Sequence, residues 1–209
     1  KNKSLDDWYE FGSTLLGGFP ELQTFGNRAN IFLADKNYDV VIDNQSISFG
    51  MIDIQKSKPL IEIMHHPISK DYFYDLKFAR GLVQRLSKIR WFSFLKMQKK
   101  VAKQINVVVT PSLNSKQDIH HDFKVPMKNI QVIPNGIDFN IFCSLPNIVP
   151  RANGVITTAS ADVPLKGLDF LLHAIAILKS EYPDINLTVI GSPRTEGHTE
   201  RLIKKLKLE

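Results

Sequence analysis

Apolar and polar positions follow two patterns along the chain, and together they predict a parallel α/β fold. Short apolar, β-branched runs that stop at polar or turn residues predict buried strands, here at 39–42, 59–64, 105–110, 130–133, 155–158 and 185–190. Between them, apolar residues recur at helical spacing and predict helices at 115–123, 167–179 and 196–206, with helix and loop over 5–32. Strands that alternate with helices are typical of βαβ units.

The periodic pattern breaks down over residues 139–153, where Pro146, Pro150 and the following Gly154 mark a boundary. We therefore expect two α/β units, 1–138 and 154–209, joined by a linker. The second unit holds one βαβ unit and a further helix, and the first has no opening strand with a glycine-rich turn. Because a parallel sheet needs several strands and two covered faces, both units are expected to be incomplete in this chain and to expose apolar sheet surface.

The composition is that of a globular protein, with 43% hydrophobic and 23% charged residues among 209. No run approaches the roughly 18 uninterrupted apolar residues of a membrane-spanning helix, and residues 1–10 lack the apolar core of a signal peptide. The single cysteine, Cys143, cannot form an internal disulfide and has no neighbouring ligands that would suggest zinc. We therefore expect a cytoplasmic protein, either soluble or peripheral at the membrane.

Charge and common motifs narrow the function classes only partly. The net charge of +6 favours polyanionic partners, but it does not separate nucleic acid, anionic lipid and phosphorylated substrates. The chain has no GxGxxG after a strand, no GxxxxGK[ST], no HExxH and no GxSxG. The sequence therefore lacks the motifs that are typical of dinucleotide oxidoreductases, P-loop hydrolases, zincins and α/β-hydrolases.

Three ordered segments carry a more specific signal. The segment 132–138 reads VIPNGID, the segment 160–168 reads SADVPLKGL, and His65 and His66 follow the strand predicted at 59–64. In order and spacing these segments resemble family 4 glycosyltransferases of GT-B fold: the V-I-P-N-G-V-D end of the acceptor domain, the G-R-x-x-x-x-K-G loop and the strand-end histidine. The runs at 39–45 and 108–112 also fit, so the resemblance extends over about residues 39–191.

The resemblance implies two Rossmann-like domains of GT-B type, both incomplete in this chain. Residues 1–138 would be the C-terminal part of the acceptor-side domain, 139–153 the linker and 154–209 the N-terminal part of the donor-binding domain. The implied activity is transfer of a hexose from a nucleotide-sugar to an acceptor (a glycan, a lipid or a small molecule) with retention of configuration, without metal or organic cofactor. The family's sugar-binding Glu-x7-Glu segment would lie beyond Glu209, so this chain alone is expected to be inactive.

Lys166 and Gly167 are the candidate residues for binding the donor diphosphate. Lys166 supplies a compact positive charge at the start of a predicted helix, where free N–H groups and the helix dipole favour an anion. Gly167 would allow close approach of the backbone. The alternative is an exposed lysine at an ordinary loop–helix junction. Counted back from Lys166, the arginine position of the family motif falls at Ala161, and Arg151 and Arg194 lie in neighbouring loops.

His65 is the candidate catalytic residue of the acceptor-side domain. The carboxyl end of a parallel strand faces the crevice in which open α/β sheets bind ligands, and an imidazole there can hydrogen-bond a sugar hydroxyl or transfer a proton. The alternative is a histidine that caps the strand through the backbone. His66, Asn135 and Gly136 are further candidates for substrate binding, and no residue group suggests a metal site.

The segment Arg80–Lys103 is basic and amphipathic. It carries eight cations and no acid, interleaved with apolar residues: Arg80, Arg85, Lys88, Arg90, Lys96, Lys99, Lys100 and Lys103. A helix or helix pair of this kind suits an anionic membrane surface. The alternative, which we favour for the apolar stripe, is that it packs on the sheet while the charges are solvated.

Two other classes of function remain open at this point. One is a different enzyme on the same scaffold, such as a nucleotide-sugar epimerase or phosphorylase. The other is a nonenzymatic nucleic-acid-binding module, suggested by the charge. Against the second, the aromatic residues at 91–94 form one helical patch, not a stacking platform on a sheet, so no nucleic-acid partner is expected.

Overall fold

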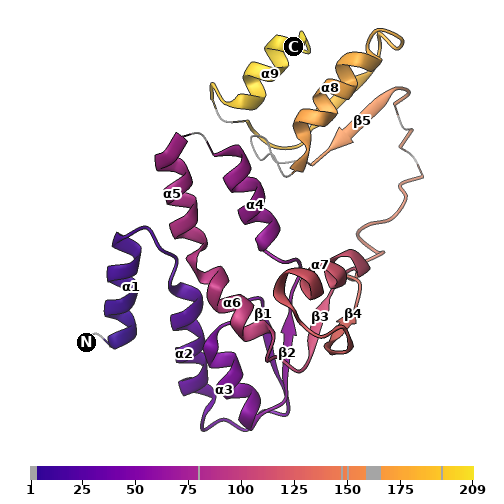
Figure 1. Cartoon of the computed structure of the whole chain (residues 1–209). Coiled ribbons are helices and arrows are strands. Elements are labelled where there is room, and N and C mark those ends of the chain that lie inside the picture. Colours follow the sequence, from indigo (N-terminus) through magenta and orange to yellow (C-terminus); the bar gives the residue numbers. More distant parts are fainter. Residues whose placement is uncertain (1–3, 80, 147, 150, 159–165, 194) are drawn as a thin grey trace. The chain divides into compact units, whose positions relative to one another are not determined.

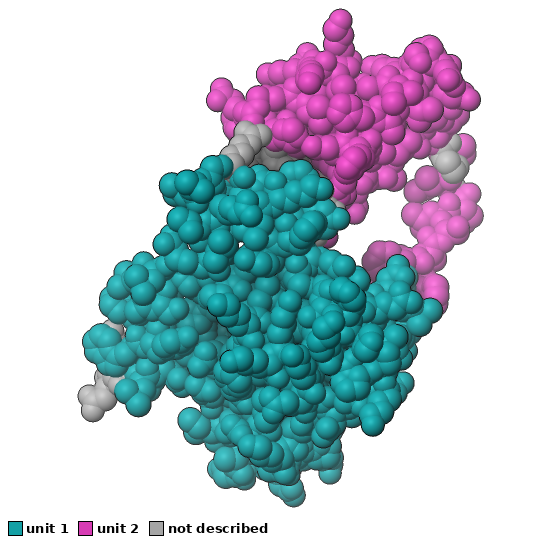
Figure 2. All heavy atoms as spheres, viewed as in Figure 1, with its two compact units in different colours: residues 1–137 teal, residues 138–209 magenta. Residues whose placement is uncertain are grey.

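The computed structural model describes residues 4–79, 81–146, 148–149, 151–158, 166–193 and 195–209. The chain divides into two compact units, Lys1–Ile137 and Asp138–Glu209, which Figure 2 colours separately. Each unit contains parallel strands connected through helices (Figure 1). The α/β class expected from the sequence is therefore confirmed.

Four parallel strands form the described sheet of the first unit. They are β1 (Val41–Asn44), β2 (Leu60–Ile63), β3 (Val108–Thr110) and β4 (Ile130–Val132), and they lie in the order β1-β2-β3-β4. In the register of the first pair, Asp43 lies beside Glu62 and Asn44 beside Ile63. Because all strands run the same way, their carboxyl ends meet at one edge of the sheet.

Helices precede and connect these strands. In chain order they are α1 (Leu5–Leu15), α2 (Glu21–Leu33), α3 (Phe49–Ser57), α4 (Ser69–Phe78), α5 (Gly81–Trp91), the 3-10 turn η1 (Phe92–Phe94), α6 (Leu95–Ala102), α7 (Leu113–Phe123) and the 3-10 turn η2 (Met127–Asn129). Ser112 caps α7 by accepting a hydrogen bond from the Ser115 amide. The crossover helices α3, α6 and α7 pack side by side, α3 against α6 and α6 against α7.

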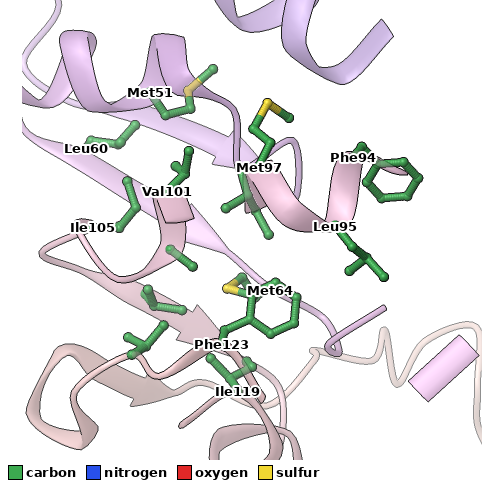
Figure 3. Packing of buried hydrophobic residues seen from close by; sticks show 14 of the residues in the cluster. Met51, Leu60, Met64, Phe94, Leu95, Met97, Val101, Ile105, Ile119 and Phe123 are labelled. Atoms are coloured by element: carbon green, nitrogen blue, oxygen red, sulfur yellow. The ribbon is translucent and has the colours of Figure 1, made fainter. Parts of the chain in front are cut away.

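The core of the first unit lies between these helices and one face of the sheet (Figure 3). Figure 3 shows side chains from α3, β2, α6 and α7 converging there, among them Met51, Leu60, Val101 and Phe123. The opposite face of the sheet is only partly covered. Ile42 of β1 is 58% exposed, and Ile133, just after β4, is also exposed. Apolar side chains of the sheet are therefore exposed, as expected from the sequence.

The second unit is smaller. Strands β5 (Gly154–Thr157) and β6 (Asn186–Val189) pair in parallel, with α8 (Leu168–Leu178) between them and α9 (His198–Leu206) after them. Its small core joins Leu168 and Leu172 of α8 to Leu202 of α9. The described part of the expected linker, 139–153, contains no helix or strand.

The apolar stripe of the basic segment was expected to pack on the sheet, and this expectation is wrong for half of the segment. The apolar side chains of η1 and α6, such as Phe94 and Val101, are buried in the core as expected. None of the side chains of α5 is buried, and Leu82 and Val83 are 79% and 82% exposed. The apolar stripe of α5 therefore does not pack on the sheet, because α6 already occupies that place between α3 and α7.

The bounds of β1 also differ from the sequence prediction, for a physical reason. The strand expected at 39–42 lies at Val41–Asn44, two residues later. Asp43 and Asn44 resemble turn residues in sequence, but they continue the ladder opposite Glu62 and Ile63. The extension places two carboxyl groups side by side, since both Asp43 and Glu62 point to the buried face.

Glu62 is protonated in the folded protein at neutral pH. Its side chain is fully buried, and this burial is the main reason that its pKa is raised to about 11, with the charge of the adjacent Asp43 carboxylate adding to the effect. Asp43 is satisfied by other donors, because its Oδ2 accepts from the Ser46 amide at 3.0 Å, the Ser46 hydroxyl at 2.8 Å and the Ile47 amide at 3.1 Å.

This raised pKa predicts a pH-dependent stability that Glu62→Gln should remove. An unfolded glutamate has a pKa of about 4.3, below the folded value. The contribution of Glu62 to the free energy of unfolding is therefore fully present below a pH of about 4.3 and is lost as the pH rises towards about 11. The loss is at most about 1.36 kcal/mol per pH unit. Glu62→Gln should therefore gain stability relative to the wild type between pH 5 and pH 9.

Urea unfolding followed by tryptophan fluorescence measures this difference, because both tryptophans, Trp8 and Trp91, belong to the first unit. Glu181→Gln, at an exposed glutamate, is the matched control and should show no such trend. A stability difference between Glu62→Gln and wild type that stays constant from pH 5 to pH 9 would contradict the burial of a neutral carboxyl group.

Candidate functional site

The candidate site of the first unit lies where β1 and β2 end. Asn44 is the last residue of β1, and His65 follows β2 after the buried Met64. The parallel register brings Asn44 and Ile63 side by side, so the residues that follow them also meet. This edge gathers Asn44, Gln45, His65 and His66, which are about twenty residues apart in sequence.

His65 is held through both its ring and its backbone. Its Nε2 lies 2.9 Å from Oδ1 of Asn44, and its backbone N–H donates to Oε1 of Gln45 at 2.9 Å. Because a carboxamide oxygen only accepts, Nε2 carries a proton in this arrangement. The ring is exposed and does not cap the strand through the backbone, which was the alternative that the sequence left open. Gln45 caps the strand end instead.

His66 has a different partner. Its Nε2 lies 2.8 Å from Oδ2 of Asp71, in the first turn of α4, and its carbonyl accepts from Nε2 of Gln45 at 3.3 Å. The side chain of His66 is exposed. Asn135 and Gly136 follow β4 at the same edge of the sheet and are also exposed, two strands away from β2.

Lys166 and Gly167 belong to the second unit. Lys166 is exposed, and Gly167 is the N-cap of α8 with φ of 72°. A left-handed backbone is the reason for glycine there, since a Cβ would meet no atom within 4 Å of the described residues. With no side chain, Gly167 offers no side-chain acceptor to the first N–H groups of α8.

An acidic residue in the first turn of this helix is already paired. Asp169 in the first turn of α8 has Oδ2 at 2.6 Å from Nε2 of His198, the first residue of α9. A protonated His198 would offset the carboxylate charge that otherwise opposes an anion at this end of the helix. Arg151 is exposed just before β5, whereas Ala161 and Arg194 lie outside the described residues.

Sequence reasoning missed Asn44 and Gln45, although it placed both in a segment that fits the family. The available signal was their position, because polar residues directly after a strand stand at the same edge as the histidines after the next strand. Among the described residues, no group of three or more His, Cys, Asp or Glu side chains could hold a metal ion. Within the same residues, every helix is too short or too polar to cross a bilayer.

Comparison with known proteins agrees with these features. A sequence model described as Glycosyltransferase Family 4 matches residues 10–140, which include His65, His66, Asn135 and Gly136. The parallel α/β units are consistent with this family. The chain belongs to glycosyltransferase family 4.

A curated relative extends the likeness over both units. The chain is 40% identical to the MMP alpha-(1->4)-mannosyltransferase of Mycolicibacterium hassiacum over 207 residues, which is 98% of this chain and 49% of the relative. The chain thus spans about half the length of the curated relative that it matches. The aligned half takes in the strand-end histidines and the Lys166 loop.

Proposed function

We propose that the protein transfers a hexose, with mannose the first candidate, from a nucleotide-sugar to an acceptor with retention of configuration. The observation that carries the proposal is the 40% identity with a mannosyltransferase over nearly the whole chain. The epimerase, phosphorylase and nucleic-acid-binding alternatives have no comparable support. The proposed reaction needs no metal, and an assay with EDTA tests that part directly.

In this proposal, Lys166 and the start of α8 bind the donor diphosphate. Charge grows on the leaving diphosphate as the glycosidic bond breaks, so donors directed at its oxygens stabilise the transition state. Lys166 supplies a full charge, and the N–H groups at the start of α8 supply a partial charge equivalent to about half a proton. Gly167 keeps this helix start free of a competing side chain.

His65 has the catalytic role in the acceptor-side unit. With Nε2 bound to Asn44, the neutral ring offers Nδ1 as a hydrogen-bond acceptor for a sugar hydroxyl. This contact would orient the reacting sugar or receive a proton from it. His66, Asn135 and Gly136 are proposed to bind substrate at the same edge, where ligands of open α/β sheets lie.

The Lys166→Ala variant tests the donor site. Removing a charged donor of this kind typically lowers turnover by about a hundred- to a thousandfold. The exposed Lys166 side chain packs against little, so the melting temperature should not change. Transfer from nucleotide-activated mannose is measured in the complete protein, with NMR of the product to establish its anomeric configuration.

Lys204→Ala removes an exposed lysine of the same unit, in the last turn of α9, and is the matched control. Wild-type turnover and unchanged binding of the nucleoside diphosphate in Lys166→Ala would assign Lys166 to the solvated surface.

The His65→Ala variant tests the acceptor-side role. Loss of a positioned proton-transfer group typically reduces kcat by about a hundred- to ten-thousandfold. The control is His173→Ala, which removes an exposed histidine of α8 that has no proposed role. Equal turnover in the two variants would show that His65 does not take part in the reaction.

We also propose reversible contact between α5 and an anionic membrane. The exposed apolar side chains of α5 lie on one helical face: Leu82, Val83, Leu86 and Ile89. Arg85 and Arg90 lie beside that face, whereas Lys88 is paired with Asp75 of α4 at 2.6 Å. An exposed apolar face flanked by arginine is suited to the interface of an anionic bilayer. The membrane-contact segment expected from sequence, Arg80–Lys103, is thereby reduced to α5, since α6 is part of the core.

Co-sedimentation with vesicles tests this contact. The protein should bind phosphatidylserine-containing vesicles more than pure phosphatidylcholine vesicles, and binding should weaken as salt shortens the Debye length from about 10 Å at 0.1 M to about 3 Å at 1 M. Replacing Leu82 and Val83 by Gln should weaken binding, whereas Val149→Gln, at a residue 87% exposed in the other unit, should not. Binding that is indifferent to lipid charge and salt would exclude this contact.

A further inference from the structure

We propose that Asn44 and Gln45 are positioning residues that fix the ring and the backbone of His65 in the orientation that sugar transfer requires. This inference rests on the proposed catalytic role of His65, and it names the residues through which the fold controls that role. Neither residue needs to touch the substrate. Their action is carried by the hydrogen bonds that they make across the ends of β1 and β2.

Asn44 selects the tautomer and the rotation of the His65 ring. Its Oδ1 lies 2.9 Å from Nε2 of His65 and can only accept, so the neutral ring keeps its proton on Nε2 and presents Nδ1 as the acceptor. Asn44 is itself fixed because it is the last residue of β1, paired in register with Ile63 of β2. The orientation of the His65 ring is therefore fixed by a residue of the sheet and not by a loop.

Gln45 holds the backbone on both sides of the His65 peptide unit. Its side-chain oxygen accepts from the His65 N–H at 2.9 Å, and its side-chain amide donates to the His66 carbonyl at 3.3 Å. These two bonds fix the chain as it leaves β2, where ladder hydrogen bonds end. A freely rotating segment there would let the imidazole move even with its ring contact intact.

The turn that presents Gln45 is unusual and well anchored. Gln45 and Ile47 both adopt left-handed backbone conformations, with φ of 67° and 48°, which is unfavourable for a β-branched residue such as Ile47. The buried Asp43 carboxylate holds the turn through three hydrogen bonds, and Gln98 of α6 donates to the Ser46 carbonyl at 3.3 Å. A strained turn fixed by buried partners is a feature that clusters at functional sites.

The ring contact is tested by nitrogen NMR of His65 in this chain at pH 9. His65→Gln identifies the signals. Wild type should show a single tautomer protonated on Nε2. Asn44→Leu, which removes the acceptor, should move both ring nitrogens towards the averaged values of a free imidazole, whereas Asn44→Asp keeps an oxygen and should preserve the tautomer. Unchanged ring signals in Asn44→Leu would overturn the proposal.

The backbone contact is tested with Gln45→Gly and Gln45→Asn, because both residues tolerate the left-handed conformation and neither can reach His65 and His66. Exchange of the His65 amide hydrogen should become about two- to tenfold faster in both variants, without loss of melting temperature. Lys124→Gly relieves another left-handed residue of the same unit, with φ of 58°, and should leave this exchange unchanged. Unaltered exchange in both Gln45 variants would overturn the role of Gln45.

Kinetics in the complete protein separate this inference from the proposed function. Asn44→Leu and Gln45→Gly should each lower kcat/KM about two- to tenfold, and Asn44→Asp should lie closer to wild type. Full transfer activity in His65→Ala would overturn the catalytic role of His65 and, with it, the functional consequence of positioning. Full activity in Asn44→Leu and Gln45→Gly, with His65→Ala inactive, would overturn the positioning alone.

Discussion

The parallel pairing of β1 with β2 is the constraint on which the first unit depends. This register sets Asp43 beside Glu62 on the buried face and Asn44 beside Ile63 on the other face. A shift of β1 by one residue against β2 would turn Asp43 to the partly covered face, away from Glu62, and would separate Asn44 from His65. The same few residues therefore decide both how the core is closed and how the strand-end histidine is held.

The two neighbouring carboxyl groups, Asp43 and Glu62, support this arrangement in different ways. Oδ2 of Asp43 accepts three hydrogen bonds from donors of the following turn, whereas Glu62 stays neutral beside it. A second buried carboxylate at that point would repel the first and loosen the turn that carries Gln45. The neutral Glu62 thus belongs to the support of the site even though it lies on the opposite face from His65.

The sequence predicted the strands and most helices because burial imposes a period on the residues, and this period is visible without a structure. It made His65 a candidate because a histidine after a buried strand is conspicuous. It could not predict the contacts of Asn44 and Gln45, which depend on the register between strands and span about twenty residues. Nor could it separate α5 from α6, because an apolar stripe looks alike whether it faces the core or solvent.

The partly covered face of the sheet in the first unit favours aggregation. Ile42 and Ile133 present apolar side chains to solvent, and β1 is an edge of the described sheet with unpaired backbone groups beside them. Such an edge can recruit strands from other molecules, and an apolar face next to it would stabilise the resulting stacks. In isolation this stretch of chain is therefore a template for aggregation, and its solubility during expression depends on what is folded against that face.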